Sequence, residues 1–385
     1  MLPGIGIFGT GSIVRVIIPF LQEKGFKVEA IWGRNLSEVY VTAQELDIPF
    51  YTTRIDDVLL RKDVDLIFVM CPPNLHAQIS VKALGIGKHV LCDRPAGLSQ
   101  GDTLKRVRAS QYYPTLISIV NHSLRFLPAF IHMRKAIEED YIGELTLIDV
   151  QVRMGSLLHK NYDWLCDSTM GGGTLTLVGS HVIDLITHLT GKRALRAHAL
   201  VRTFTKTTTQ ISGIRHVSAP DFCTFQIELE GGGIVTANLN NHLAGSFSQE
   251  ILVCGTKGHL VVKGSDLFGY RDKNEAIYID DEDFSITSSV SAFESTMPLP
   301  YLKGLHKMIG ALKEAFLPVE DKTGWVKEPV ANAATFDDGL YVQAVMEALK
   351  KSSLDKEWVK VNIISEEPDP NPILSAAVRC SAIPT

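Results

Sequence analysis

A glycine turn near the start of the chain has the residue types and spacing that can hold a dinucleotide. The apolar segment 5–8 leads into Gly9-Thr10-Gly11, and apolar residues then recur at three- and four-residue steps, as on one face of a helix. The first glycine permits the tight bend and the second lets phosphates approach the backbone, while the amides of Ser12 and Ile13 face the anion. Val14 stands where the motif has a third Gly or Ala. The segment therefore predicts a pyrophosphate site, with a plain strand-to-helix turn as the structural alternative.

The residues after the second predicted strand bear on which dinucleotide would bind. NAD-specific folds place Asp or Glu there, and its carboxylate binds the ribose 2′-hydroxyl. This chain has Gly33-Arg34-Asn35 instead. No acid is present, and the Arg34 guanidinium can pair with a 2′-phosphate. The sequence therefore favours NADP(H) over NAD(H); the alternative is that Arg34 is a solvated side chain near a helix start.

Strands and helices are expected to alternate through the first part of the chain. Predicted strands cover residues 5–8, 27–32, 50–51, 65–70 and 89–92, and predicted helices cover 13–21, 35–46, 56–60 and 76–84. Asn35 and Glu38 have the spacing of a helix N-terminal cap. This alternation is typical of the α/β class with a Rossmann-type, doubly wound parallel sheet.

The second part of the chain reads mainly as strands. These are expected at residues 145–152, 197–204, 222–229, 234–239, 250–253 and 260–262, with helices at 181–189, 301–316 and 336–349. Three glycines at 231–233 predict a hairpin turn between two of the strands. Residues 369–385 contain three prolines and little periodicity, and we expect a loose tail there.

Length and composition exclude several classes of protein. A chain of 385 residues, 45% hydrophobic and 21% charged, predicts a globular protein of two domains. A net charge of −5 argues against a nucleic-acid partner, and charges or glycines interrupt the apolar runs before they could span a membrane. Six cysteines without C-x-x-C spacing argue against a zinc site or a disulfide framework, so no metal is expected.

The apolar N-terminal segment 1–21 bears on location. It lacks a charged start and has Arg15 within the apolar stretch, with no small-residue cleavage site after it. We therefore expect a cytoplasmic protein, with secretion as the alternative if this segment acts as a signal.

Taken together, the motifs of the first half resemble those of the glucose–fructose oxidoreductase/inositol dehydrogenase/rhizopine catabolism (Gfo/Idh/MocA) family. They are Gly9-Thr10-Gly11, Pro72-Pro73-Asn74-Leu75-His76, Gly-Lys-His-Val-Leu-Cys at 87–92, and Asp93-Arg94-Pro95 in the place of Glu-Lys-Pro. Similar blocks continue at 143–145, 170–173, 179–184, 254–258 and 338–342. Segments 109–114, 125–130 and 211–217 look most like the animal glucose–fructose oxidoreductase domain-containing branch of that family.

The resemblance implies a Rossmann domain, placed here at residues 1–121, and a C-terminal α/β domain at 122–368 with a large, mostly antiparallel sheet. One face of that sheet commonly forms the oligomer interface in the family, so we expect a homo-oligomer. The family's cofactor-binding positions, together with the glycine turn and Arg34, give the expected nucleotide contacts: Gly9, Gly11, Ser12, Ile13, Arg34, Cys71, Pro72, Asn74, His76, Asp93, Arg94 and Pro95. Taken alone, a histidine at position 76 is more often a capping or packed residue, and it is the whole Pro-Asn-x-x-His motif that favours a place beside the cofactor.

The resemblance also locates three catalytic positions, and two of them are altered. Hydride transfer at a carbinol carbon needs a group that exchanges the hydroxyl proton. The family's lysine is Arg94 here, which can bind an oxyanion but has a pKa too high to trade protons near neutrality. The family's aspartate is Leu177, which cannot orient a histidine. The histidine is retained as His181, as a general acid–base or as a packed helix-start histidine.

Two functional hypotheses follow. In the first, the protein binds NADP(H) and its dehydrogenase activity is weak, altered or lost. In the second, it is an active NADP-dependent oxidoreductase of a sugar, polyol or related carbonyl compound, with His181 as acid–base and Arg94 as oxyanion clamp. The family's Trp-Arg-x-Asp motif occurs as 164–167 without its arginine. The expected walls of the substrate pocket are Asn121, His122, Trp164, His181 and Arg215.

Overall fold

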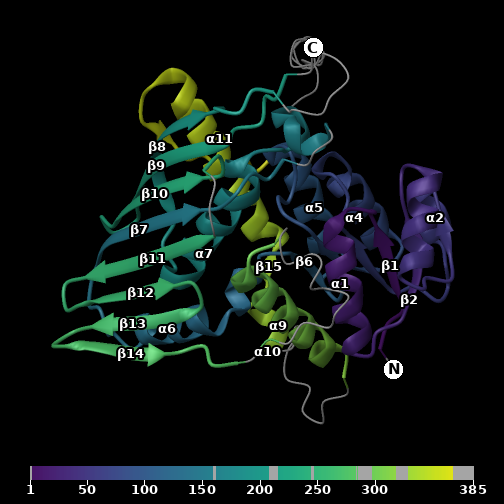
Figure 1. The fold of residues 1–385 in the computed structure, drawn as a ribbon, viewed down its shortest axis with the longest axis horizontal. Helices are drawn as coiled ribbons and strands as arrows, with labels where there is room; N and C mark the ends of the chain where they lie inside the picture. Colours follow the sequence, from purple (N-terminus) through teal and green to yellow (C-terminus); the bar gives the residue numbers. More distant parts are fainter. Residues whose placement is uncertain are drawn as a thin grey trace, which may run out of the picture.

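The computed structural model describes residues 2–158, 162–207, 216–243, 247–282, 284, 297–317 and 328–366. It contains two β-sheets that lie side by side, each with its own helices (Figure 1). This confirms the fold class expected from the sequence. The predicted tail at 369–385 and the expected pocket residue Arg215 lie outside the described residues.

The first sheet has seven strands in the order β15-β6-β5-β4-β1-β2-β3. Its strands are β1 (Ile5–Phe8), β2 (Val28–Trp32), β3 (Tyr51–Thr52), β4 (Leu66–Val69), β5 (His89–Cys92), β6 (Ser118–Val120) and β15 (Ala334–Thr335). All neighbouring strands are parallel except β15, which is antiparallel to β6. Strands β1 and β4 are buried throughout, as expected when helices cover both faces of a parallel sheet.

Short helices connect these strands. They are α1 (Ser12–Glu23), α2 (Leu36–Glu45), α3 (Ile55–Leu59), α4 (His76–Gly85) and α5 (Gln100–Tyr112), with a 3₁₀ turn, η1 (Pro73–Leu75), before α4. The predicted cap of α2 is confirmed, because the Asn35 side chain accepts a hydrogen bond from the Ser37 amide at 3.0 Å. The carboxyl ends of β1, β4 and β5 lie together, so the segments that follow them meet at one edge of the sheet.

The second sheet has nine strands in the order β14-β13-β12-β11-β7-β10-β9-β8-β16. They are β7 (Leu145–Arg153), β8 (Ala194–Arg202), β9 (Phe222–Leu229), β10 (Ile234–Asn240), β11 (Ser248–Gly255), β12 (His259–Lys263), β13 (Asp266–Tyr270), β14 (Asn274–Tyr278) and β16 (Val359–Lys360). Only the pair β7–β10 is parallel, so the sheet is mostly antiparallel as expected. Strands β13 and β14 were not predicted from the sequence; in β14 the residues of Asn274–Tyr278 are exposed or half-buried and give no buried alternation.

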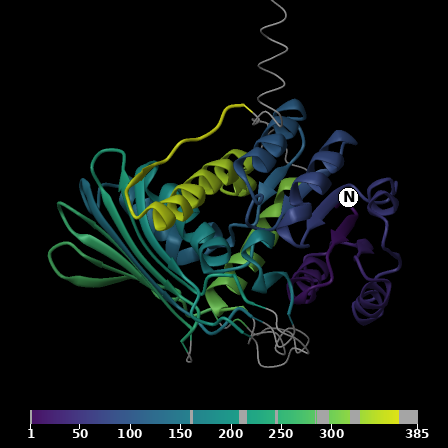
Figure 2. The ribbon, with the colours of Figure 1, turned by 90° about the horizontal axis from the view of Figure 1, so that it is seen from above.

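The helices of the second part lie against one face of this sheet, and the opposite face carries no described helix (Figure 2). They are α6 (Pro128–Glu138), α7 (Ser180–Thr190) and α11 (Phe336–Asp355). Buried and accessible residues alternate along β9 and β10, the pattern of a sheet with one packed face. The short turns η2 (Ser123–Phe126), η3 (Trp164–Cys166) and η4 (Ser168–Met170) and the π-helical turn η5 (Leu175–Gly179) precede these helices or lie between them.

Late segments of the chain return to the first sheet. Helix α9 (Leu299–Phe316) packs on α1, and its Leu302 and Leu305 share an apolar core with Ile5 and Ile7. The short helix α10 (Glu328–Ala331) and strand β15 follow it. The predicted domain boundary after residue 121 separates two stretches of sequence, but residues near the C-terminus also belong to the core of the first sheet. The boundary itself stays a prediction.

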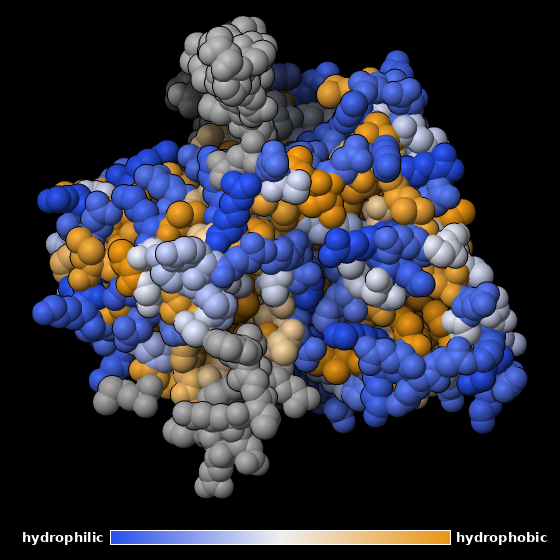
Figure 3. All heavy atoms as spheres, turned by 180° about the vertical axis from the view of Figure 1, so that it is seen from behind, coloured by the Kyte–Doolittle hydropathy of each residue, from blue (hydrophilic) through white to orange (hydrophobic). Residues whose placement is uncertain are grey.

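Seen from behind, apolar patches alternate with charged and polar ones (Figure 3). Among the residues that the structure describes, no helix combines the length and apolarity needed to cross a bilayer. Residues 5–23 form β1 and α1, so the apolar N-terminal segment is built into the first core.

Candidate functional site

A cavity of about 610 Å³ lies between the carboxyl edge of the first sheet and the second part of the chain. The first part contributes the start of α1 and the segments after β4 and β5; the second contributes the segment after β7, the turns η3 and η5, and the start of α9. The described lining residues are Gly11, Ser12, Ile13, Val16, Met70, Cys71, Asp93, Arg94, Met154, Gly155, Ser156, Leu157, Leu158, Trp164, Leu165, Leu177, Val178, Phe247, Met297, Pro298 and Tyr301.

At the α1 end, the two glycines of the turn have different structural roles. Gly9 has φ +135°, and a Cβ there would lie 2.5 Å from the Met70 carbonyl oxygen, so the bend needs glycine. Gly11 has no atom within 4 Å of the position that its Cβ would occupy. Because glycine has no Cβ, the space in front of the helix at Gly11 is open, as a bound pyrophosphate requires.

The electrostatics at the start of α1 favour an anion. The helix has no side-chain cap at Gly11 and no acidic residue in its first turn, so its positive end is not neutralised locally. Arg15, one turn later, donates from Nη1 to the Thr10 carbonyl at 2.9 Å and pairs with Glu45 of α2. Arg15 thereby fixes the glycine turn against α2, a role that the sequence reading did not assign.

Arg34 lies apart from this cavity. It is exposed at the end of β2, next to Asn35, the cap of α2. A smaller hollow of about 300 Å³, lined by Thr10, Arg15, Ser37, Glu38, Val41 and Thr42, lies beside the same helix start. Arg34 is not among the described lining residues of this hollow.

His76, from the Pro-Asn-x-x-His segment, is buried behind the cavity wall. Its Nδ1 lies 2.9 Å from the Pro95 carbonyl and its Nε2 lies 2.7 Å from the Cys71 carbonyl. Burial alone would lower its pKa, but Cys92 and the Pro95 carbonyl outweigh that effect and raise it. Because both ring nitrogens face acceptors, the imidazolium form satisfies both contacts. His76 therefore ties the segment after β4 to the segment after β5.

The expected nucleotide contacts divide into two groups. Six line the cavity: Gly11, Ser12, Ile13, Cys71, Asp93 and Arg94. The other six, Gly9, Arg34, Pro72, Asn74, His76 and Pro95, lie outside its described lining. Asn74 is exposed, and Pro95 is buried after a cis peptide bond with Arg94.

Arg94 and Asp93 form a charged pair on the cavity wall. Arg94 Nη1 donates to Asp93 Oδ1 at 2.8 Å, and Asn121 Nδ2 donates to the same oxygen at 3.0 Å. Arg94 Nε and Asn121 Oδ1 are buried and have no hydrogen-bond partner among the described residues. The guanidinium is therefore held in place by Asp93 while it keeps donor capacity for a ligand.

His181 lies behind the wall, against Tyr301. Its ring centroid is 5.0 Å from that of Tyr301 and 5.3 Å from that of His122, and its Nδ1 has no described partner. Burial, followed by the charges of Arg94 and His122, lowers the pKa of His181 well below its usual range. His181 is therefore a neutral imidazole near neutral pH, able to accept a proton only weakly.

Leu177 occupies the cavity wall itself. It lies in the π-helical turn η5 that runs directly into α7, and it lines the cavity together with Val178. Local π geometry often accompanies functional sites because it displaces side chains from the regular helical positions. Position 177 presents an apolar side chain to the cavity, so Leu177 itself can neither orient His181 nor carry a proton.

A buried ion pair fixes the helix that carries His181. Arg125 of η2 donates from Nε and Nη2 to the two carboxylate oxygens of Asp184, at 2.8 and 2.6 Å. Asp338, at the start of α11, lies 3.3 Å from the same guanidinium. Since Asp184 is three residues after His181 on α7, this pair anchors the helix next to the cavity.

The other expected pocket residues lie at different depths. Trp164 lines the cavity, whereas Asn121 and His122 are buried behind it, and both ring nitrogens of His122 lack described partners. Asp167 caps η4 by accepting from the Thr169 amide at 2.8 Å, so it has a structural role.

Several lining residues were not predicted from the sequence. Met154, Leu157, Leu158, Phe247, Met297 and Tyr301 belong to segments that are far apart in the chain and carry no motif. Tyr301 begins a predicted helix, but nothing in its neighbours indicated that its ring would face the cavity.

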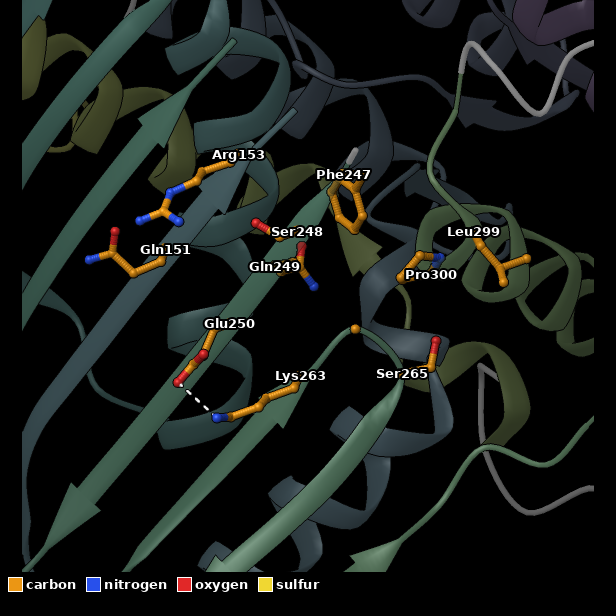
Figure 4. A pocket seen from close by; sticks show the side chains of 11 residues that line it. Gln151, Arg153, Phe247, Ser248, Gln249, Glu250, Lys263, Ser265, Leu299 and Pro300 are labelled. Carbon is orange, nitrogen blue, oxygen red and sulfur yellow. Dashed lines mark ion pairs between the residues drawn. The ribbon is translucent and has the colours of Figure 1, made fainter. Parts of the chain in front are cut away.

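A second cavity, of about 500 Å³, lies on the uncovered face of the second sheet (Figure 4). Gln151 and Arg153 of β7, Glu250 of β11 and Lys263 of β12 line it, and Lys263 Nζ lies 3.6 Å from Glu250 Oε1. Phe247 lines both cavities. No group of three potential metal ligands occurs among the described residues, and the five described cysteines carry free thiols.

Two family sequence models match the chain. Residues 4–113 match the oxidoreductase family with an NAD-binding Rossmann fold, and residues 130–261 match the Gfo/Idh/MocA C-terminal domain. Glucose-fructose oxidoreductase domain-containing protein 1 of Mus musculus is 47% identical over 386 residues, covering 99% of this chain and 98% of that protein. Glucose-fructose oxidoreductase domain-containing protein 2 of Homo sapiens is 45% identical over 381 residues, covering 98% of each.

The fold is also similar to solved structures. Levoglucosan dehydrogenase, in a complex with NADH and L-sorbose, superposes with a TM-score of 0.76 over 94% of this chain and 99% of its own. The identity is 17%, so this likeness concerns the fold.

Proposed function

The chain belongs to the Gfo/Idh/MocA oxidoreductase family, and on that premise we propose that it is an NADP(H)-binding protein whose dehydrogenase turnover is strongly reduced or lost. One observation carries this proposal. Open space at Gly11 and a first helical turn of α1 without an acidic residue suit an anion, and the same cavity is lined by Arg94 and Leu177, at the positions where the family resemblance implies lysine and aspartate.

Nucleotide binding is supported by the chemistry of the residues at the α1 end. The open space at Gly11, the uncapped helix start and the absence of a first-turn acid suit a pyrophosphate. Cys71 and Asp93, at the ends of β4 and β5, would border the rest of the dinucleotide. When bound, the nicotinamide would supply the hydride chemistry of the family.

A preference for the phosphorylated nucleotide is supported by the end of β2. Arg34 is exposed there, and the two residues beside it are Gly33 and Asn35, so no carboxylate is in place for a ribose 2′-hydroxyl. An exposed guanidinium suits a 2′-phosphate because it forms bidentate hydrogen bonds with phosphate oxygens.

Reduced turnover is supported by the ionisation of the residues at the three family catalytic positions. Arg94 stays protonated near neutrality, Leu177 has no ionisable group, and the lowered pKa of His181 makes it a poor base. Arg94 could bind a carbonyl oxygen, but neither Arg94 nor Leu177 can exchange its proton near neutrality.

The alternative is an active NADP-dependent oxidoreductase of a sugar, polyol or related carbonyl compound, with His181 as acid–base and Arg94 as oxyanion clamp. It is favoured by the unpartnered Nδ1 of His181 and by the nearby charge of Arg94. A homo-oligomer through the uncovered face of the second sheet, and a cytoplasmic location, stay predictions.

Nucleotide binding can be tested by titrating the protein with NADPH and NADH and following cofactor fluorescence. We expect saturation with both and tighter binding of NADPH. Arg34→Ala should remove the preference, about tenfold or more for one charged pair, while NADH affinity stays unchanged. Arg271→Ala, an exposed arginine beyond β13, is the matched control. Equal affinity of the unaltered protein for the two nucleotides would refute the role of Arg34.

A further inference from the structure

The half of the cavity beyond Arg94 has an apolar wall. The described side chains from the second part of the chain are Met154, Ser156, Leu157, Leu158, Trp164, Leu165, Leu177, Val178, Phe247, Met297, Pro298 and Tyr301. This part of the lining contains no carboxylate, amide or ammonium group. The charged side chains of the described lining are Asp93 and Arg94, both after β5.

Most polar groups on this wall already have partners. The Tyr301 hydroxyl donates to Gln249 Oε1 at 3.2 Å, and Ser156 Oγ accepts from the Leu158 amide at 3.1 Å. Asp93, which lies on the first part of the chain, accepts from Arg94 and Asn121 through its Oδ1 atom. Arg94, by contrast, uses only Nη1 among the described residues, so its guanidinium can still donate to a ligand oxygen.

Such a wall matches one ligand class and disfavours another. A sugar or polyol carries a hydroxyl on nearly every carbon, and each hydroxyl that is buried without a partner opposes binding. A ligand with one oxygen acceptor and an aromatic or branched aliphatic body satisfies Arg94 and buries apolar surface against Leu158, Leu165 and Phe247.

We propose that the ligand of this half-cavity is an apolar carbonyl compound, an aromatic or branched aliphatic ketone, aldehyde or 2-oxo acid, and not a sugar. This proposal rests on the function proposed above, in which the α1 half of the same cavity holds the nucleotide. The replacement of the family's aspartate by Leu177 fits it, because that change removes a hydroxyl-binding carboxylate from the wall and adds apolar surface.

The test is saturation-transfer NMR on the full chain, with and without NADPH. The probes are phenylacetone, phenylpyruvate, D-glucose and L-sorbose at equal millimolar concentrations. We expect saturation transfer to both phenyl compounds and none to the sugars. Phenylpyruvate shares the body of phenylacetone and adds a carboxylate, so the ratio of their affinities shows whether Arg94 takes a carbonyl alone or a carboxylate as well.

Two variants place the binding in this cavity. Leu165→Asp puts a carboxylate into the apolar wall at a half-buried position and should weaken phenylacetone binding by about tenfold or more. Leu60→Asp, at a strongly exposed leucine on the first part of the chain, should leave it unchanged. Phenylacetone binding that Leu165→Asp does not alter, no binding of either phenyl compound, or sugar signals equal to the phenyl signals would each overturn the proposal.

Failure of this inference is separable from failure of the proposed function. The same samples are titrated with NADPH by fluorescence. Absence of nucleotide binding overturns the proposed function, whereas the NMR series without nucleotide still decides which ligand class the apolar wall accepts. Nucleotide binding together with sugar binding retains the proposed function and overturns the apolar ligand.

Discussion

Replacing Arg125 should destabilise the protein, because the ion pair that holds the helix carrying His181 is lost. In Arg125→Met, the Asp184 carboxylate loses both of its charge-assisted hydrogen bonds, and its side chain is only 1% exposed, so water cannot replace them. Removing one partner of a buried ion pair costs about 3–5 kcal/mol. At roughly 2 °C per kcal/mol for a chain of this size, the thermal midpoint should fall by about 6–10 °C.

The dependence on pH gives this prediction a second readout. In the unaltered protein, burial alone would raise the pKa of Asp184, but Arg125 and His122 lower it. Without Arg125 the burial effect dominates, so the folded-state pKa of Asp184 should rise above its unfolded value. A carboxyl with a raised folded pKa favours folding below that pKa and loses the contribution as pH increases. The deficit of Arg125→Met should therefore be larger at pH 8 than at pH 5.

Two further proteins complete the experiment, which follows unfolding by circular dichroism. The double variant Arg125→Met/Asp184→Leu replaces the ion pair with an apolar pair and should recover most of the lost stability. Lys135→Met breaks an exposed pair with Glu139, with atoms 3.8 Å apart, and should change the midpoint very little. The reasoning would be refuted if Arg125→Met lowered the thermal midpoint no more than Lys135→Met does, or if the double variant were no more stable than Arg125→Met.

Three other perturbations have defined outcomes. Gly11→Ala should keep the thermal midpoint but weaken NADPH binding, because its Cβ points into the open space proposed for the pyrophosphate. Gly9→Ala should lower the thermal midpoint, because its Cβ meets the Met70 carbonyl. Equal midpoints for the two variants would contradict this. Burial, with nearby Arg125 and Arg134, lowers the pKa of His188 to about 3, so the unfolded state binds the extra proton between pH 6.5 and about 3 and stability falls as pH decreases through that window. His188→Gln should therefore reduce the slope of the free energy of unfolding against pH by about 1 kcal/mol per pH unit on the acid side. An unchanged slope would argue against this assignment. Arg94→Lys with Leu177→Asp should give oxidoreductase turnover at 340 nm that His181→Ala abolishes; turnover already present in the unaltered protein would favour the active-enzyme alternative.

Local sequence was a good guide to the first sheet and to the glycine turn beside the cavity. The bend at Gly9 requires a backbone conformation that glycine adopts without strain, and the apolar runs of β1 and β4 are continuous because both faces are covered. The Asn35 cap was predicted correctly because a capping interaction involves residues two or three positions apart. Strand ends were less well predicted: β8 begins at Ala194, three residues before the predicted start.

The composition of the opposite wall depended on contacts between distant residues. Tyr301 reaches the cavity because α9 packs on α1, almost three hundred residues earlier, through a core that includes Leu302 and Ile5. His181 was expected in the pocket but lies behind Tyr301, since the Arg125–Asp184 pair and the packing of α7 set its depth. How deeply a side chain is buried depends on how helices and strands pack against one another, so it cannot be predicted from the periodicity of one element.

By itself, then, the sequence determined the family, the alternation of strands and helices, the glycine turn and the presence of Arg94 and Leu177. These are properties of residue type and short spacing, which backbone sterics and burial convert directly into local structure. Only the tertiary structure decided that an apolar wall lies across the cavity from the glycine turn, that His181 is buried and its pKa lowered, and that C-terminal segments complete the first core. Those features arise from non-local packing, in which each side chain's surroundings are supplied by elements far away in the chain.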